Sequence, residues 1–281
     1  MTRAALGWLV LVIWTCVLGW NAQREFFRPD AERLALGAAT LPPGAAYYAV
    51  ETGDRPAGMV TVQIDTLPAR RGFHVSERLE IRLPGLGPAG EIEVDTDSWL
   101  GPGVTLDSLE RRTVRGADTI RVRARVGDGR LRWEGPSDTI VFELPADAVV
   151  QTETSWPLRY AAAGGARVDE VRRITLLDAA AGAVRELDLT TREIGRRVFA
   201  DSADTDPETG EWIAAGRDTV SAWRVEVRPA AIGRSPNEAM AGPDGTAAWV
   251  DEDGRYVETE LSGGLRMRRT AFELAFFRET P

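Results

Sequence analysis

The sequence predicts a mainly β protein: one N-terminal transmembrane helix is followed by one or more antiparallel curved sheets, as a half-barrel or sandwich, with short flanking helices. Three observations lead to this fold class. Residues 4–20 carry no charge, the later segments alternate apolar and polar residues, and turn-forming residues separate those segments at short intervals. Alternation with a period of two is typical of antiparallel strands that have one covered and one wetted face.

The apolar N-terminus, residues 1–22, is interpreted as a membrane anchor or signal segment. Its uncharged run spans about 26 Å as a helix, which is near the short limit for crossing a bilayer. Trp8, Trp14 and Trp20 are the predicted anchor residues, because tryptophan favours lipid and its interface with water. A cleaved signal is the alternative, although the small residues that a cleavage site needs are poorly placed. Cys16 also permits a lipoprotein, but bulky residues precede it.

The short N-terminal flank favours a single-pass protein of the inner membrane, with its N-terminus in the cytoplasm and the β-domain in the periplasm. The expected partners are therefore the lipid bilayer and a protein in the membrane or periplasm. Nucleic acid is not an expected partner, because the chain has a net charge of −9 and shows no concentrated basic face.

Several kinds of catalysis are excluded by residue type. The 34 basic residues are all arginine, so no Schiff-base or phosphate-loop lysine is present. The one cysteine lies in the apolar segment, and His74 is the one histidine. A thiolate metal site or a nucleophile that needs two imidazoles is excluded downstream. We assign no catalytic residue, cofactor-binding residue or metal ligand, expect no cofactor, and predict that the protein is not an enzyme.

Residues 23–45 are expected to form a spacer. Pro29 to Leu36 can form a short helix, with Asp30 near its start and Gly37 near its end, and Pro42-Pro43-Gly44 then stops it. The remaining chain is divided into a first β half, residues 46–150, and a second β half, residues 151–281. The boundary lies where alternation fades, over residues 146–167. The sequence leaves open whether the two halves form one sheet or two.

The first half contains the clearest alternation. In the segment 73–83, Phe73, Val75 and Leu79 share one face, while His74 and Arg78 share the other. The segment 91–97 carries acidic residues at alternate positions, and the segment 120–126 carries arginines at the same period. These acidic and basic ladders are expected to pair across strands on a solvated face. Residues 47–52 and 59–66 form a predicted hairpin.

The second half contains predicted strands at residues 173–177, 184–189, 197–200 and 219–228. Residues 247–260 form the sharpest predicted hairpin, turning at Asp253-Gly254. Phe272, Ala275 and Phe276 recur at helical spacing, so a short amphipathic helix is expected near the C-terminus.

Four candidate features each have a simpler interpretation. Residues 85–90 match GxGxxG, but Pro88 interrupts them and a strand follows, which predicts a loop. Residues 204–210 carry alternating oxygen ligands, but the glycine is misplaced for a calcium loop, which predicts a turn. A general-base role for His74, on the polar face of its strand, would need a nucleophile or carboxylate nearby in space, which spacing in the sequence does not show. Four tryptophans are expected in the core, or else they line a lipid cavity: Trp133, Trp212, Trp223 and Trp249.

The segments Tyr47-Tyr48-Ala49-Val50 to Gly58-Met59-Val60 and AWVDEDGRYVETELSGGLRMRRTAFELAFF resemble the exported β-domain that precedes the catalytic core of some bacterial transglutaminase-like proteins. The resemblance covers about residues 43–278. That core uses a Cys–His–Asp triad, which this chain lacks, so the resemblance implies a non-enzymatic module. The predicted architecture is also similar to lipoprotein-carrier half-barrels.

The favoured function is an accessory or structural subunit, tethered to the membrane, that docks on a membrane protein complex such as a respiratory or photosynthetic one. The alternative is a periplasmic carrier that binds a lipid-like ligand in a half-barrel cavity.

Overall fold

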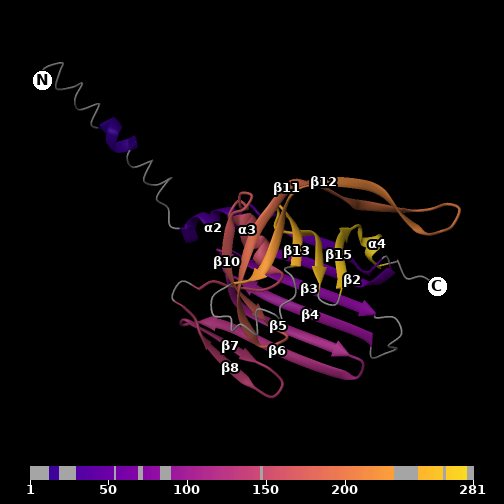
Figure 1. Cartoon of the computed structure of the whole chain (residues 1–281), viewed down its shortest axis with the longest axis horizontal. Coiled ribbons are helices and arrows are strands. Elements are labelled where there is room, and N and C mark those ends of the chain that lie inside the picture. The colour runs from indigo at the N-terminus through magenta and orange to yellow at the C-terminus, as the bar shows by residue number, and fades with distance from the viewer. Residues whose placement is uncertain are drawn as a thin grey trace, which may run out of the picture.

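The computed structural model describes residues 13–18, 30–53, 55–68, 72–82, 90–145, 148–230, 246–261 and 264–276. In these residues fifteen strands form one sheet, in the order β8-β7-β6-β5-β4-β3-β2-β1-β15-β14-β13-β12-β11-β10-β9 (Figure 1). The strands are β1 (Gly44–Thr52), β2 (Arg55–Thr66), β3 (Phe73–Arg82), β4 (Glu91–Leu100), β5 (Leu106–Arg115), β6 (Asp118–Gly127), β7 (Arg130–Glu134), β8 (Thr139–Glu143), β9 (Val150–Gln151), β10 (Val171–Asp178), β11 (Ala183–Thr205), β12 (Trp212–Pro229), β13 (Thr246–Asp251), β14 (Tyr256–Leu261) and β15 (Leu265–Thr270).

Three labelled helices accompany the sheet: α2 (Asp30–Ala38), α3 (Ser155–Ala162) and α4 (Phe272–Phe276). The predicted spacer helix and C-terminal helix are thereby confirmed. Residues 13–18 are also helical, and their side chains are exposed. No helix in the described part of the chain has the length and apolar character needed to cross a membrane. The predicted anchor lies largely outside the described residues.

One sheet joins both halves of the chain. β1, from the first half, pairs with β15, from the second half, in antiparallel register from Tyr47 opposite Thr270 to Thr52 opposite Leu265. All neighbouring strands are antiparallel except β9 and β10. The predicted mainly β, antiparallel class is confirmed, and a single curved sheet replaces the alternative of a sandwich.

The curvature of the sheet brings its two edges together. The edge strands β8 and β9 are consecutive in the chain, and the six intervening residues cannot span more than about 25 Å. Trp133 of β7 donates from Nε1 to the carbonyl of Ala179, in the turn after β10, at 3.0 Å. A Cβ at Gly182 would lie 2.8 Å from the Trp133 ring, so glycine is needed at that close approach. A side chain, not a strand ladder, therefore links the two ends of the open sheet.

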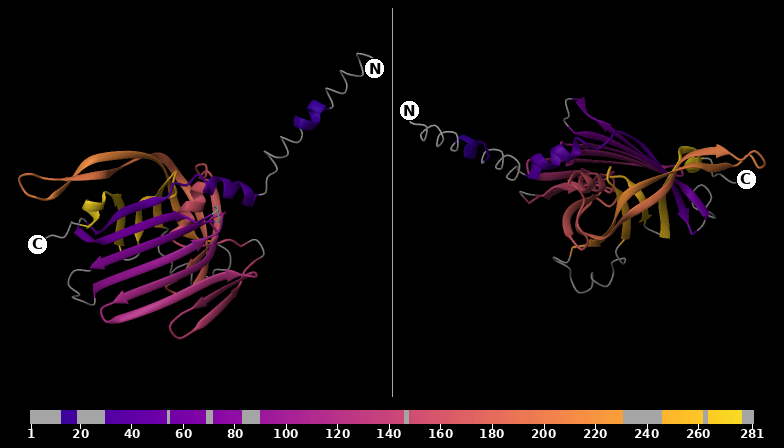
Figure 2. Two further views of the ribbon diagram at one scale, coloured as in Figure 1. Left: turned by 180° about the vertical axis from the view of Figure 1, so that it is seen from behind. Right: turned by 90° about the horizontal axis from the view of Figure 1, so that it is seen from above.

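Helix α3 packs against the inner face and was not predicted. Trp156 lies 5.8 Å from Tyr256, and Tyr160 lies 5.7 Å from Trp223, both in edge-to-face geometry. α2 lies beside α3 (Figures 1 and 2), and Gly37 permits the approach because a Cβ there would lie 1.9 Å from the Ala162 carbonyl. The aromatic side chains of α3 thus pack against β12 and β14.

The predicted alternation of β3 is confirmed, since Phe73 and Val75 are buried in the core and Arg78 is exposed. The predicted direct pairing of the acidic and basic ladders is wrong, because β5 lies between β4 and β6. β5 mediates the pairing instead. Its Arg112 contacts Asp95 of β4 at 3.1 Å, and its Glu110 contacts Arg123 of β6 at 3.2 Å.

Strands β11 and β12 continue far beyond the rest of the sheet. β10 pairs with β11 only as far as Thr190, and β13 pairs with β12 only from Ala222 onward. Residues 193–221, which we call the arm, contain the long remainder of this hairpin. Figures 1 and 2 show the arm projecting past the other strands, on the side of the molecule away from α2.

Candidate functional site

The first candidate feature is a row of polar side chains on the inner face of the sheet. Register places Val62, Glu77, Thr96, Arg111 and Val122 side by side across five strands. Both valines belong to the core, so Glu77 and Arg111 face inward between them. The Nε of Arg111 is buried and finds no hydrogen-bond partner in the described part of the chain.

Glu77 is the unusual acid in this row. Burial raises the pKa of its carboxyl to about 7, the nearby Glu153 adds to the rise, and Arg111 opposes it. Sequence reasoning missed Glu77, although a signal was visible: it occupies the same period-two positions as Val75 and Leu79. Glu153 and Thr154, in the loop before α3, lie close to this inward acid.

We expect the free energy of unfolding to fall as the pH rises from about 4.5 to about 7, the ordinary and folded pKa values of Glu77. In that window the folded protein keeps a proton on Glu77 that the unfolded chain has lost, so rising pH favours unfolding. Glu77→Gln should flatten this dependence by up to about 3 kcal/mol in urea titrations at several pH values. Glu186→Gln, on an exposed strand position, is the control, and parallel curves for wild type and Glu77→Gln would contradict the expectation.

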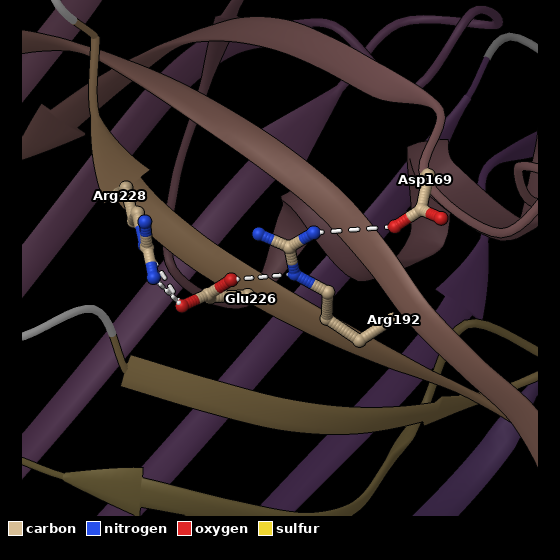
Figure 3. Close-up of polar contacts among 4 residues, drawn as sticks. All are labelled: Asp169, Arg192, Glu226 and Arg228. Atoms are coloured by element: carbon tan, nitrogen blue, oxygen red, sulfur yellow. Dashed lines mark hydrogen bonds and ion pairs between the residues drawn. The ribbon is translucent and has the colours of Figure 1, made fainter.

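The second candidate feature is the base of the arm. The register of β11 and β12 shifts between Thr191 and Glu193, which makes Arg192 the extra residue of a β-bulge. Figure 3 shows its guanidinium between two carboxylates: Nε donates to Glu226 at 2.7 Å, and Nη1 donates to Asp169 at 3.2 Å. Arg228 donates from Nε to the other oxygen of Glu226 at 2.8 Å. These contacts connect β11 to β12 and to Asp169 at the point where the arm begins.

One face of the arm packs back on the protein. Phe199 and Ala222 are buried with Trp249 and Val257. The guanidinium of Arg197 lies 3.4 Å from the centre of the Trp249 ring, which is a close cation–π contact. The arm is therefore anchored at its base by both ionic and apolar contacts.

Large apolar side chains are exposed along the rest of the arm: Ile194, Val198, Trp212 and Ile213. Single exposed apolar residues are common on the surfaces of monomers, whereas four on one projecting element are typical of an interaction surface. The end of the arm, residues 198–216, adds five carboxylates and no basic residue. The arm therefore presents an apolar and strongly acidic surface.

The third candidate feature is a groove of about 540 Å³ across β2 to β6, on the outer face, opposite the core. We call it the arginine groove, because five arginines line it: Arg78, Arg112, Arg121 and Arg123 on the outer face, and the inward-facing Arg111. Its acidic residues are Asp95, Asp97 and Glu110 on the outer face, and the inward-facing Glu77. A charged open groove of this kind suits polar or charged ligands and not lipid chains.

The predicted anchor residues are placed only in part. Trp14 lies in the helical residues 13–18 and is 64% exposed. Trp8 and Trp20 lie outside the described residues. The exposure of Trp14 agrees with a residue that contacts lipid or a partner helix, and the role of all three tryptophans stays a prediction.

The structure places the other sequence candidates in part. His74 has a carboxylate beside it, Asp97 at 2.9 Å, and it stacks on Trp99. The acidic loop 204–210 is a turn, in which Asp206 accepts backbone hydrogen bonds from Glu208 and Thr209. No described group of three or more His, Cys, Asp or Glu side chains is arranged to hold a metal ion. Most of the predicted loop 85–90 lies outside the described residues.

The four candidate tryptophans divide between core and surface. Trp133 and Trp249 are buried, and Trp223 is half-buried against the core, which confirms the core interpretation for these three. Trp212 is 38% exposed, near the end of the arm. The core prediction is wrong for Trp212, because it lies on the arm, where β12 pairs with β11 and has run past the end of β13.

These features define a class: a mainly β protein whose single curved sheet is packed by a helix and carries a projecting arm. No family model matches the chain, and no curated protein matches it. Among solved structures, it is similar to a β-barrel-like protein of domain of unknown function DUF1849 from Brucella abortus, with 15% identity over 82% of this chain and 95% of that chain, and a TM-score of 0.48. It is also similar to a DUF1089 family protein from Pseudomonas aeruginosa, with 9% identity over 78% and 90% of the two chains, and a TM-score of 0.41. The resemblance to transglutaminase-like proteins stays a prediction.

Proposed function

We propose that the protein is a non-enzymatic docking module of the cell envelope, tethered by its apolar N-terminus and joined to a protein partner through the arm. The observation that carries the proposal is the arm itself. Residues 193–221 extend beyond the sheet, and they expose Ile194, Val198, Trp212 and Ile213 to solvent. Exposure of apolar side chains to water is unfavourable, so a partner that covers the side chains of this projecting hairpin lowers the free energy.

The fixed base of the arm supports the proposal. Arg192 joins Asp169 and Glu226, and Phe199 packs on Trp249, so the arm does not have to be ordered at the moment of binding. A preorganised element binds with a smaller entropic cost than a flexible one. Docking is favoured over lipid carriage because aromatic residues of α3 occupy the inner face and charged residues line the outer groove.

The tether and its location are further parts of the proposal. The apolar residues 4–20 and the exposed side chains of residues 13–18 support a membrane contact. We expect the full chain to stay with inner membranes after alkaline extraction, and we expect the β-domain to become accessible to protease once the outer membrane is opened. A β-domain that is protected under those conditions would contradict a periplasmic location.

The docking proposal is tested by quantitative mass spectrometry of proteins that co-purify with the full chain in mild detergent. The double variant Val198→Ser/Ile213→Ser is expected to lose its partner at least about tenfold, because it removes exposed apolar surface from the arm. Ile140→Ser/Val141→Ser is the matched control, since those residues are exposed on β8, far from the arm in the sheet order. Equal partner recovery from both variants, or a chain that retains neither another protein nor a second copy of itself, would overturn the proposal.

A further inference from the structure

The acidic end of the arm pairs with no cation in the described part of the chain. Residues 198–216 contain five carboxylates and no basic residue, and none of the five forms an ion pair in the part of the chain described. The five are Asp201, Asp204, Asp206, Glu208 and Glu211. Repulsion among carboxylates on one hairpin opposes a compact arrangement, and a cationic surface that covers the hairpin would relieve it.

Arginines oppose one another in the arginine groove and beside it. Arg112 and Arg121, which line the groove, lie directly opposite each other on β5 and β6, and Arg125 and Arg132 do the same next to the groove on β6 and β7. Like charges at directly opposed positions destabilise a sheet. Arg112 is paired with Asp95, but Arg121 and Arg125 form no ion pair with any described residue. These two guanidiniums are available to an acidic ligand.

The spacing of the two surfaces is compatible. Arg121 and Arg123, the second of which already lies 3.2 Å from Glu110, are two residues apart on one strand, so their side chains leave the same face about 6.8 Å apart along it. Asp204, near the end of β11, and Asp206, in the turn that follows it, are also two residues apart in the chain. An extended hairpin laid across β5 and β6 can therefore bring carboxylates and guanidiniums together in register, with bidentate contacts available to arginine.

We infer that the acidic end of the arm of one molecule binds the arginine groove of a second copy of this chain. The inference rests on the proposed function, since it names the partner of the same arm. A single molecule does not satisfy both surfaces, because the arm carries its acidic end past the other strands (Figures 1 and 2). The contact joins two different surfaces, so it propagates from copy to copy into short chains or rings. Tethered neighbours in one membrane would be joined side by side.

The test is sedimentation of the purified full chain in detergent micelles, across protein concentration and at low and high salt. We expect concentration-dependent self-association that weakens as salt is raised, because surface charges are screened. The groove variant Arg121→Glu/Arg123→Glu and the arm variant Asp204→Arg/Asp206→Arg should each weaken self-association at least about tenfold. Asp138→Arg/Glu186→Arg, which reverses two exposed acids outside both surfaces, should associate as the wild type does.

Mixing supplies the decisive result. The groove variant keeps an intact arm and the arm variant keeps an intact groove, so an equimolar mixture should form one-to-one pairs that grow no further. A wild type that stays monomeric at low salt, a mixture that does not pair, or a groove variant that associates normally would overturn the inference. If the wild type is monomeric yet still retains another protein through Val198 and Ile213, then the inference fails and the proposed function stands. If the wild type neither self-associates nor retains another protein, both the inference and the proposed function fail.

Discussion

Replacing Asp251 with alanine is expected to lower the free energy of unfolding by about 3–5 kcal/mol, measured by guanidinium titration. Asp251 is 2% exposed, and its Oδ2 accepts from Nη1 of Arg269 at 2.7 Å. Its Oδ1 accepts the backbone N–H groups of Asp253 and Arg255 at 3.0 and 2.8 Å. The substitution leaves the guanidinium of Arg269, which is 14% exposed, without its counter-charge and opens the turn between β13 and β14.

The control for this expectation is Glu143→Ala. Its partner Arg130 lies at 2.8 Å, but both side chains are largely exposed, so the loss should be about 0–1 kcal/mol. Equal losses for Asp251→Ala and Glu143→Ala would mean that burial of the charge is not what makes Asp251 important.

Trp133→Ala is expected to cost about 3–5 kcal/mol of stability, because it empties a buried ring site and removes the contact between the two ends of the sheet. Hydrogen exchange should show its mechanism: protection should fall together in β7 and in the turn between β10 and β11, which are distant in the chain but joined by this side chain.

Trp133→Phe separates the two contributions of the residue. It keeps an aromatic ring in the core and removes the N–H that Ala179 accepts, so the expected loss is about 1–3 kcal/mol, set by an unsatisfied carbonyl and a smaller ring. A loss of protection confined to β7 in Trp133→Ala would show that the two edges are not coupled through this residue.

Local pattern was sufficient for much of the sheet. β3 was predicted because its apolar and charged residues alternate strictly, and the turn at Asp253-Gly254 was predicted because those residues favour a tight hairpin. α3 was not predicted, since seven of its eight residues are buried and a helix covered all round has no amphipathic stripe. β5 was missed as well, and with it the relay between the acidic and basic ladders.

The candidate site was predicted less completely than the fold. The acidic loop after Asp204 was recognised as a turn, but its position at the end of a projecting arm depends on where β10 and β13 stop pairing with their neighbours. The arginines of β6 were recognised as one face of a strand, but the opposition of Arg121 to Arg112 depends on a strand that the sequence did not reveal.

The sequence by itself determined the strand class, the alternation of faces, the terminal helix, the residue types that exclude lysine and thiolate chemistry, and the expectation of an apolar anchor. These follow from periodicity and composition, which are properties of neighbours in the chain. The tertiary structure decided that both halves share one sheet, that Trp133 links its edges, that Glu77 faces inward, and that an acidic arm and an arginine groove occupy different surfaces. These depend on strand order and on contacts between residues far apart in the chain, which no local period encodes.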